Sequence, residues 1–212
     1  MSKRFWAVIA VIILIFVGVL VMKNNKTNAP GTGAKATNHV EGASTTGVKL
    51  VEYGDYECPY CEEYYPIVKQ VVAQYGDKIS FQFRNLPLTS IHPNALAAAR
   101  AAEAASLQGK FWQMHDLLYG DQNAWVSSSD PLTVFDQFAA SLGLNKTQFN
   151  TDFASSKVND TIQADIAAFN KTGDPEATPA FYLNGKQIQP GVSVSDFTKL
   201  IDAQIAASTT KK

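Results

Sequence analysis

The sequence predicts an α/β fold that contains an inserted block of helices and is preceded by one N-terminal transmembrane helix. Three observations lead to this prediction. Alternating, β-branched segments occur near residues 48–84 and again at 177–188. The stretch between them, about residues 92–170, has helical periodicity throughout. The first 22 residues contain a long apolar run, and the 212-residue chain is long enough for one folded domain plus a tail.

The N-terminal apolar run, residues 5–22, carries no charge and reads FWAVIAVIILIFVGVLVM. It is long enough to cross a bilayer as a slightly short helix. A cleaved signal peptide is the alternative, but its apolar part is typically about 7–15 residues long, and no small-x-small cleavage site follows directly. Residues 1–22 are therefore predicted to be a short cytoplasmic stub and a retained anchor. The flanking charges are balanced and do not set the orientation.

Residues 23–46 are rich in Asn, Thr, Gly and Ala and contain almost no large apolar side chains. This composition predicts a flexible linker, in which His39 would be a solvated residue. The folded domain is expected to span residues 47–207, and the polar residues 208–212 are expected to form a frayed tail.

The first part of that domain predicts a strand, a helix and a second strand, at residues 48–53, 61–75 and 79–84. Gly76 closes the helix. Two strands joined through one helix imply a right-handed parallel crossover.

The helical block follows and runs from His92 to about Asn170. Phe111, Met114 and Leu118 have helical spacing and are expected in the core. His92 and His115 are expected to be capping or surface residues.

The end of the domain returns to β structure. Residues 177–188 predict two strands joined by an Asn-Gly turn, and residues 194–207 predict an amphipathic closing helix.

Cys58 and Cys61 are the only two cysteines, and they are separated by Pro59 and Tyr60 at a predicted helix start. Two thiols at this spacing can cycle between dithiol and disulfide, so thiol–disulfide exchange is the expected chemistry. Cys58 lies where free backbone N–H groups and the helix dipole stabilise a thiolate, and it is the expected nucleophile. Cys61, one turn further along, is expected to be more buried and to act as the resolving thiol.

Other interpretations of the cysteine pair are weaker. A zinc site usually needs four ligands, but the chain has no second cysteine pair and its three histidines are irregularly spaced. A purely structural disulfide would gain little from closing so short a loop. We therefore expect no metal and no cofactor. Nucleic acid is not an expected partner either, because 18 basic and 19 acidic residues are evenly mixed and give a net charge of −1.

The order of these motifs resembles the DsbA-like thiol–disulfide oxidoreductases, which have a thioredoxin fold with a helical insertion. The resemblance covers about residues 47–207. It is carried by the following segments: Cys58-Pro59-Tyr60-Cys61, Asn85-Leu86-Pro87-Leu88 with His92-Pro93, the run Ala95 to Ala105, Lys110 to Asp116, and Thr178-Pro179. The resemblance implies that Pro179 is cis and lies against the two cysteines. It also implies that the backbone of Thr178 pairs with an extended substrate strand.

The resemblance also suggests which residues tune the site. Glu52 lies six residues before Cys58, where the family holds a buried acid that would assist proton transfer at Cys61. The alternative is that Glu52 points to solvent, because a buried carboxylate is costly without a partner. Pro59-Tyr60 stands where the best-known members have Pro-His, so one imidazole that stabilises the thiolate is missing and the redox potential is left open.

Together these observations predict a membrane-anchored, extracytoplasmic oxidase that introduces disulfides into exported proteins and is reoxidised by a membrane partner. A disulfide-forming site belongs in an oxidising compartment, which favours the extracytoplasmic side. One alternative is a reductase or isomerase kept reduced by a membrane electron donor. An alternative of another class is a non-catalytic peptide-binding module in which the cysteines are incidental.

Overall fold

The computed structural model of the chain describes residues 34–209. The predicted anchor at 1–22, the first part of the predicted linker and the last three residues of the tail lie outside this range, so the anchor stays a prediction. Within residues 34–209, none of the helices combines the length and the apolar character needed to cross a bilayer.

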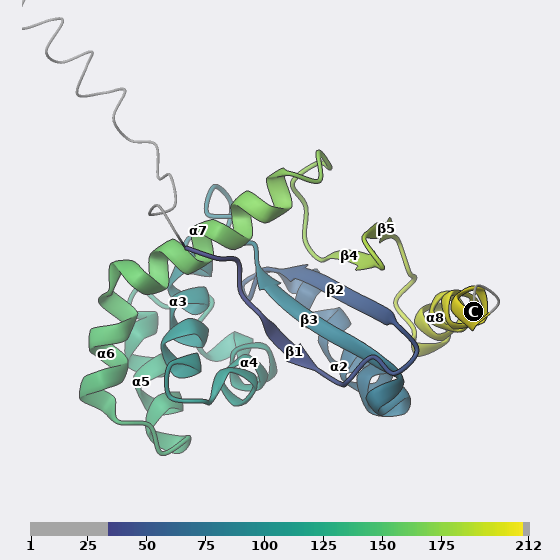
Figure 1. Cartoon of the computed structure of the whole chain (residues 1–212). Helices are drawn as coiled ribbons and strands as arrows, with labels where there is room; N and C mark the ends of the chain where they lie inside the picture. Colours follow the sequence, from purple (N-terminus) through teal and green to yellow (C-terminus); the bar gives the residue numbers. More distant parts are fainter. Residues whose placement is uncertain (1–33, 210–212) are drawn as a thin grey trace, which may run out of the picture.

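The described chain is built on a five-stranded sheet with the strand order β1-β3-β2-β4-β5 (Figure 1). The strand bounds are β1 His39–Glu41, β2 Val48–Gly54, β3 Ile79–Asn85, β4 Ala180–Leu183 and β5 Lys186–Ile188. Strands β2 and β3 are parallel, with Leu50 opposite Phe81, and are joined through α2 (Pro59–Tyr75). The predicted strand–helix–strand crossover is therefore confirmed. The predicted Asn184-Gly185 turn joins β4 to β5, with positive φ at both residues.

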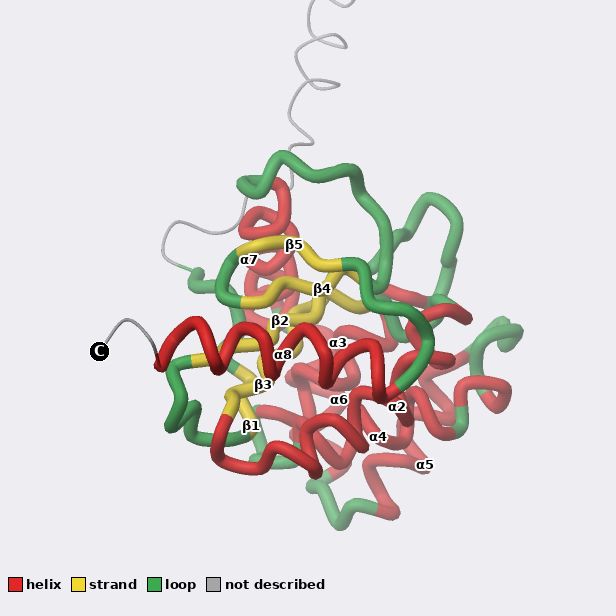
Figure 2. The backbone as a smooth tube through the Cα atoms, turned by 90° about the vertical axis from the view of Figure 1, so that its right-hand side faces the viewer, coloured by secondary structure: helices red, strands yellow, loops and turns green. Residues whose placement is uncertain are grey.

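Helices cover both faces of this sheet. α2 and α8 (Val194–Thr209) pack on one face, where Phe181 and Phe197 share a core with the apolar side of α2. Figure 2 shows α8 and α2 running side by side in front of the strands. On the other face α7 packs Phe169 against Tyr53.

The predicted helical insertion is confirmed as five helices between β3 and β4; the first four gather at one end of the sheet, and the fifth runs back over one face (Figure 1). Their bounds are α3 Ala95–Ser106, α4 Phe111–Gly120, α5 Pro131–Ser141, α6 Lys146–Ala154 and α7 Ser156–Asn170. Seven alanines of α3 are buried, and such small side chains allow neighbouring helices to approach closely. The core positions expected at Phe111, Met114 and Leu118 are buried.

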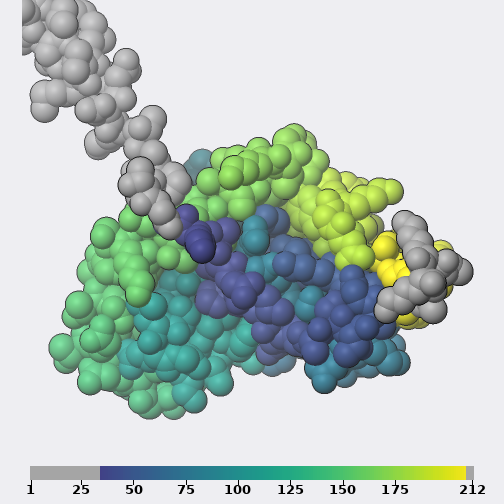
Figure 3. All heavy atoms as spheres, viewed as in Figure 1, coloured from purple at the N-terminus to yellow at the C-terminus, as the bar shows by residue number. Residues whose placement is uncertain are grey.

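One boundary prediction is wrong, because residues 37–41 of the expected linker belong to the fold. β1 pairs antiparallel with β3, and the buried Thr37 donates from both its N–H and its hydroxyl to the Asp165 carboxylate of α7. His39 is not solvated: its Nε2 lies 2.9 Å from a carboxylate oxygen of Glu103, and its ring stacks on Phe111. Figure 3 shows this first described segment, in purple, lying against the insertion. Polar contacts to distant residues hold this segment, so its sequence lacks the apolar residues that would have predicted it as part of the fold.

Candidate redox site

Strand β2 ends at Gly54, which is closely packed just ahead of the cysteine pair. A Cβ added at this glycine would lie 2.5 Å from the Phe83 ring and 2.8 Å from the Tyr119 hydroxyl, so no larger residue fits without movement. Cys58 follows as the N-cap of α2 with extended backbone angles, and Pro59 occupies the first turn, where its missing N–H is not needed. The cysteine pair therefore begins the helix, as the sequence predicts.

The two thiols are in contact and differ strongly in acidity. The Cys61 thiol donates a hydrogen bond to the Cys58 sulfur, and this is the largest cause that lowers the pKa of Cys58 from 9.0 to about 6. Burial opposes the shift, while Thr178 and the backbone N–H groups at the helix start add to it. Burial raises the pKa of Cys61, which is fully buried, and the neighbouring Cys58 raises it further. This asymmetry provides an activated nucleophile and a protonated second thiol.

The loop before β4 closes over the pair. The Thr178–Pro179 peptide bond is cis, as the resemblance implies, and the Cys58 sulfur lies 3.4 Å from the carbonyl oxygen of Thr178. Residues 120 positions apart in the chain therefore meet at the reactive sulfur. Cys58 itself is only 4% exposed, so a partner thiol must reach it along the adjoining surface.

That surface contains a groove of about 300 Å³ between the start of α2 and the β4–β5 region. Tyr60 is 65% exposed and lines one side, and the Thr178–Pro179 segment lines the other. Tyr64 donates its hydroxyl to the Pro190 carbonyl and so holds the far wall in place. The groove is suited to an extended peptide that lies across Cys58.

Glu52 lies on β2 beneath the cysteines and is 3% exposed, so the solvent-facing alternative is wrong. Burial is the main cause that raises its pKa from 4.5 to about 8, and the charge of Cys58 raises it further. Among the described residues, no hydrogen bond reaches its carboxyl group. At neutral pH this acid is therefore mostly protonated and has a proton to donate.

Several residues that hold the site in place were not predicted from the sequence. Asp55 is buried, and its carboxylate accepts hydrogen bonds from the backbone of Glu57 and Leu88 and from His92. Gln122, in a short 3₁₀ turn after α4, donates its amide to the carbonyls of Tyr56 and Cys58. The only sequence signal for these residues was Asp55, three positions before Cys58, and an aspartate there is also typical of an ordinary turn.

The two other histidines do not both match the expected surface role. His92 is half-buried against Asp55, whereas His115 is only 5% exposed, so the surface prediction is wrong for His115.

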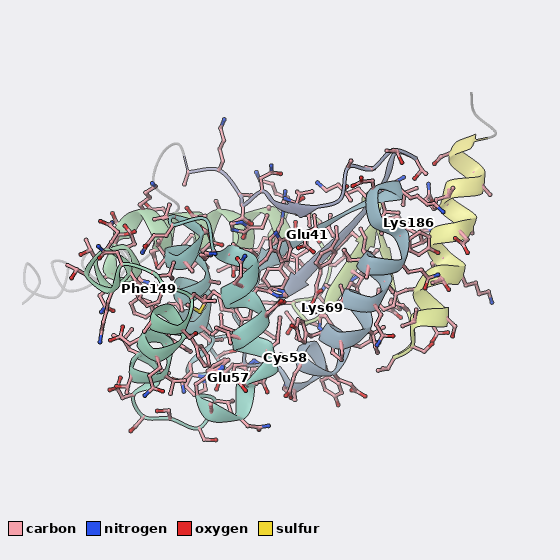
Figure 4. The ribbon with its side chains drawn as sticks, turned by 90° about the horizontal axis from the view of Figure 1, so that it is seen from below. Glu41, Glu57, Cys58, Lys69, Phe149 and Lys186 are labelled. Atoms are coloured by element: carbon pink, nitrogen blue, oxygen red, sulfur yellow. The ribbon has the colours of Figure 1, made fainter. Side chains whose placement is uncertain are left out.

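Figure 4 shows Cys58 where α2 meets the insertion, with Phe149 further into the insertion. Within residues 34–209, no cluster of three His, Cys, Asp or Glu side chains is arranged to hold a metal ion.

Comparison with known proteins shows which family and which proteins this chain is similar to. The thioredoxin family model matches residues 34–203. A Na(+)/H(+) antiporter NhaA of Salinispora tropica is 37% identical over 150 residues, which are 71% of this chain and 22% of that protein. The chain thus spans about a quarter of the length of the curated relatives it matches.

Two solved structures extend the comparison. A thioredoxin-like oxidoreductase from Silicibacter pomeroyi shares 28% identity and a TM-score of 0.65, over 78% of this chain and 90% of that one. The alpha-DsbA1 protein of Wolbachia pipientis shares 22% identity and a TM-score of 0.71, over 88% and 98%. The second likeness concerns the fold, including the helical insertion.

Proposed function

The chain belongs to the thioredoxin family and has the DsbA-like architecture, and from this membership we propose that it is a protein thiol–disulfide oxidoreductase. The observation that carries the proposal is the acidity difference within one touching pair, in which the pKa of Cys58 is lowered to about 6 and that of Cys61 is raised. Such a pair has the properties that thiol–disulfide exchange needs.

The proposed reaction moves two electrons from a substrate dithiol to the Cys58–Cys61 disulfide. A substrate thiolate attacks the Cys58 sulfur, the bond between the two cysteines breaks, and Cys61 leaves as a thiolate that takes up a proton. The second substrate thiol loses its proton and attacks the substrate sulfur of the mixed disulfide. Cys58 then leaves as a thiolate, the substrate carries a disulfide, and the enzyme holds the reduced pair.

We propose the oxidase direction for this exchange. A lowered pKa stabilises the reduced form as a thiolate, and stabilising the reduced form makes a disulfide more oxidising. Tyr60 replaces the imidazole of the best-known relatives, yet Cys61, Thr178 and the helix start still lower the pKa of Cys58. The support for this direction is therefore chemical and local to the site.

The cellular setting belongs to the same proposal. Residues 5–22 would anchor the chain in the membrane, with the redox domain on the extracytoplasmic side and exported proteins as substrates. A membrane redox partner would reoxidise the pair. Antiporter activity is not proposed, because the matched region is about a quarter of those relatives.

The direction is tested by the equilibrium redox potential of the full chain in detergent, titrated against glutathione. Buried Trp125 directly follows the turn whose Gln122 side chain donates to the Cys58 carbonyl, and it serves as a fluorescence reporter. We expect a value near the oxidising end of the family scale, about −120 mV, whereas a value near about −270 mV would indicate a reductase. The Cys58→Ser/Cys61→Ser double variant is the control. A signal that titrates equally in the double variant would contradict thiol exchange altogether and favour a non-catalytic peptide-binding module.

The setting is tested separately by labelling intact cells with a membrane-impermeant maleimide after mild reduction. An extracytoplasmic domain is expected to be labelled at Cys58 before lysis. Labelling only after lysis would contradict the proposed orientation.

A further inference from the structure

A second cavity of about 260 Å³ lies away from the peptide groove, between α2 and α4 and against the sheet. Five of its twelve lining side chains are apolar, namely Val68, Val72, Ala73, Phe81 and Trp112. Glu52 lines the same cavity, so the acid beneath the cysteines is reached from this side of the molecule. The cavity has no part in the mechanism proposed above.

The inner part of the cavity carries polar atoms that have no hydrogen-bond partner among residues 34–209. Both ring nitrogens of His115 and the hydroxyl of Tyr119 are buried without a hydrogen bond, and both residues line the cavity with Glu52. The Tyr56 hydroxyl is also unpaired, and its ring contacts that of His115. Buried polar groups normally have a protein or water partner, and a cavity of this size has room for several waters.

The outer part of the cavity carries charge. Lys69 of α2 and Asp116 of α4 form an ion pair of 2.7 Å with both side chains about half exposed, and Glu41 of β1 lies beside them. In the view of Figure 4, Lys69 is drawn between Glu41 and Cys58. Asp116 also lies 3.5 Å from Nδ1 of His115. His115 therefore lies against a surface carboxylate and lines the same cavity as the buried Glu52.

We propose that this cavity holds water and that His115 passes protons through it between Asp116 at the surface and Glu52. His115 is a positioning residue in this role, since it does not touch the reacting sulfur atoms. The inference rests on the proposed function and extends it to the route by which protons reach the site.

Proton balance requires such a route. When the disulfide is reduced, Cys61 leaves as a thiolate in a fully buried position, and its raised pKa means that it takes a proton. Protonated Glu52 can supply that proton and becomes a carboxylate. The carboxylate must then be reprotonated from solvent before the next turnover, and the reverse transfer accompanies reoxidation.

The chemistry of His115 suits the transfer. Burial is the main cause that lowers its pKa, so the ring is neutral at neutral pH. A neutral imidazole has one donor and one acceptor nitrogen, and can therefore accept a proton on one side while releasing one on the other. The titratable groups around it come from four parts of the fold: Glu52 of β2 with Tyr56 of the next loop, Tyr65 and Lys69 of α2, Asp116 and Tyr119 of α4, and His39 and Glu41 of β1.

The direct test is the rate at which Glu52 loses its proton after a jump from about pH 6 to about pH 9.5, across its pKa of about 8. The full chain in detergent, kept reduced, is followed by time-resolved infrared absorption of the protonated carboxyl group. Glu52→Gln identifies the band by removing it. We expect His115→Ala to slow the deprotonation roughly tenfold or more, and added imidazole to restore it by filling the vacated space.

Two further variants distinguish the loss of the proton relay from a loss of packing. His115→Gln keeps a polar side chain of similar size without a relay, and is expected to be slow with a near-normal melting temperature. Phe149→Leu, a buried change in α6, is the control for lost packing and is expected to leave the rate unchanged. A wild-type rate in both His115 variants, or slowing that imidazole does not restore, would overturn the proposal. Because the readout needs no thiol exchange, failure of the proposed enzyme activity would be seen separately in the redox titration.

Discussion

His92 donates a hydrogen bond from Nδ1 to the Asp55 carboxylate across 2.7 Å, and so joins the loop before α3 to the loop that carries Cys58. The backbone N–H groups of Glu57 and Leu88 donate to the same carboxylate. The Asp55 carbonyl in turn accepts from the N–H of Cys58. This buried carboxylate therefore fixes the backbone just ahead of the nucleophile, because three donors converge on it.

We predict that Asp55→Ala destabilises the protein by about 3 kcal/mol, since it leaves one buried and two partly buried donors without their acceptor. His92→Ala removes only one of these donors and is expected to cost about 1 kcal/mol. Chemical denaturation of both variants measures the difference. The iodoacetamide reaction of Cys58 is expected to slow several-fold in Asp55→Ala as the loop relaxes. Equal stability of the two variants would contradict this account of the loop.

The acidity difference within the cysteine pair leads to a second prediction. Cys58→Ser removes the more acidic, nucleophilic thiol and is expected to abolish exchange with protein substrates. Cys61→Ser keeps the nucleophile but cannot form the Cys58–Cys61 disulfide. Its Cys58 thiolate still attacks substrate disulfides in the reverse exchange, and without the Cys61 thiol to attack the Cys58 sulfur these mixed disulfides are expected to accumulate. Non-reducing gels of cells that express each variant show the difference. If neither variant changes activity, the proposed mechanism is wrong.

Glu52 gives a prediction for the dependence of stability on pH. Its pKa is about 8 in the folded chain and 4.5 ordinarily, so between these values the folded state holds a proton that the unfolded state has lost. Stability must therefore fall as pH rises through this window, by on the order of 5 kcal/mol in total for the carboxyl group alone. Glu52→Gln is expected to remove this contribution.

The cysteines must be excluded from that measurement. The lowered pKa of Cys58 acts in the opposite direction, because stability from this thiolate rises between about pH 6 and pH 9. Denaturation curves are therefore compared with and without Glu52→Gln in the Cys58→Ser/Cys61→Ser background. Equal slopes of stability against pH in the two proteins would contradict the buried, protonated state of Glu52.

The architecture was predictable from the sequence because each of its parts has a local signal. Alternating apolar residues mark β2 and β3, helical spacing marks the insertion, and Asn184-Gly185 marks the last hairpin. The cysteine pair and the Thr178-Pro179 segment are short motifs that can be recognised without knowledge of the fold. The resemblance to a known family placed Glu52 under the site, which spacing alone left undecided.

The remaining features depend on contacts between distant residues. Thr37 is ordered because a carboxylate 128 residues later accepts its hydrogen bonds, and nothing near Thr37 in the sequence indicates this. His115 was expected at the surface, but it lies in the core because rings from four segments surround it: Tyr56, Tyr65, Phe83 and Trp112. From the sequence alone a histidine in a helix is expected to be exposed, because the rings and the cavity that surround it come from other parts of the chain.

The groove beside Cys58 leads to a last prediction, which concerns Tyr60. This ring is 65% exposed next to the nucleophile and lines the groove. An aromatic side chain that a bound peptide covers typically contributes about 1–2 kcal/mol, or roughly five- to thirty-fold in affinity. Tyr60→Ala is therefore expected to raise the KM for a cysteine-containing peptide by about this factor.

The design of this test separates binding from chemistry. A small dithiol does not fill the groove, so its rate of exchange with the Tyr60→Ala variant is expected to fall far less than that of the peptide. Leu107→Ala is the matched control, because Leu107 is also an exposed apolar residue, 42% exposed at the end of α3, but does not line the groove. An equal loss with peptide and small dithiol would mean that Tyr60 acts on the acidity of Cys58 instead of on substrate binding, since a change at the sulfur affects both reactions alike.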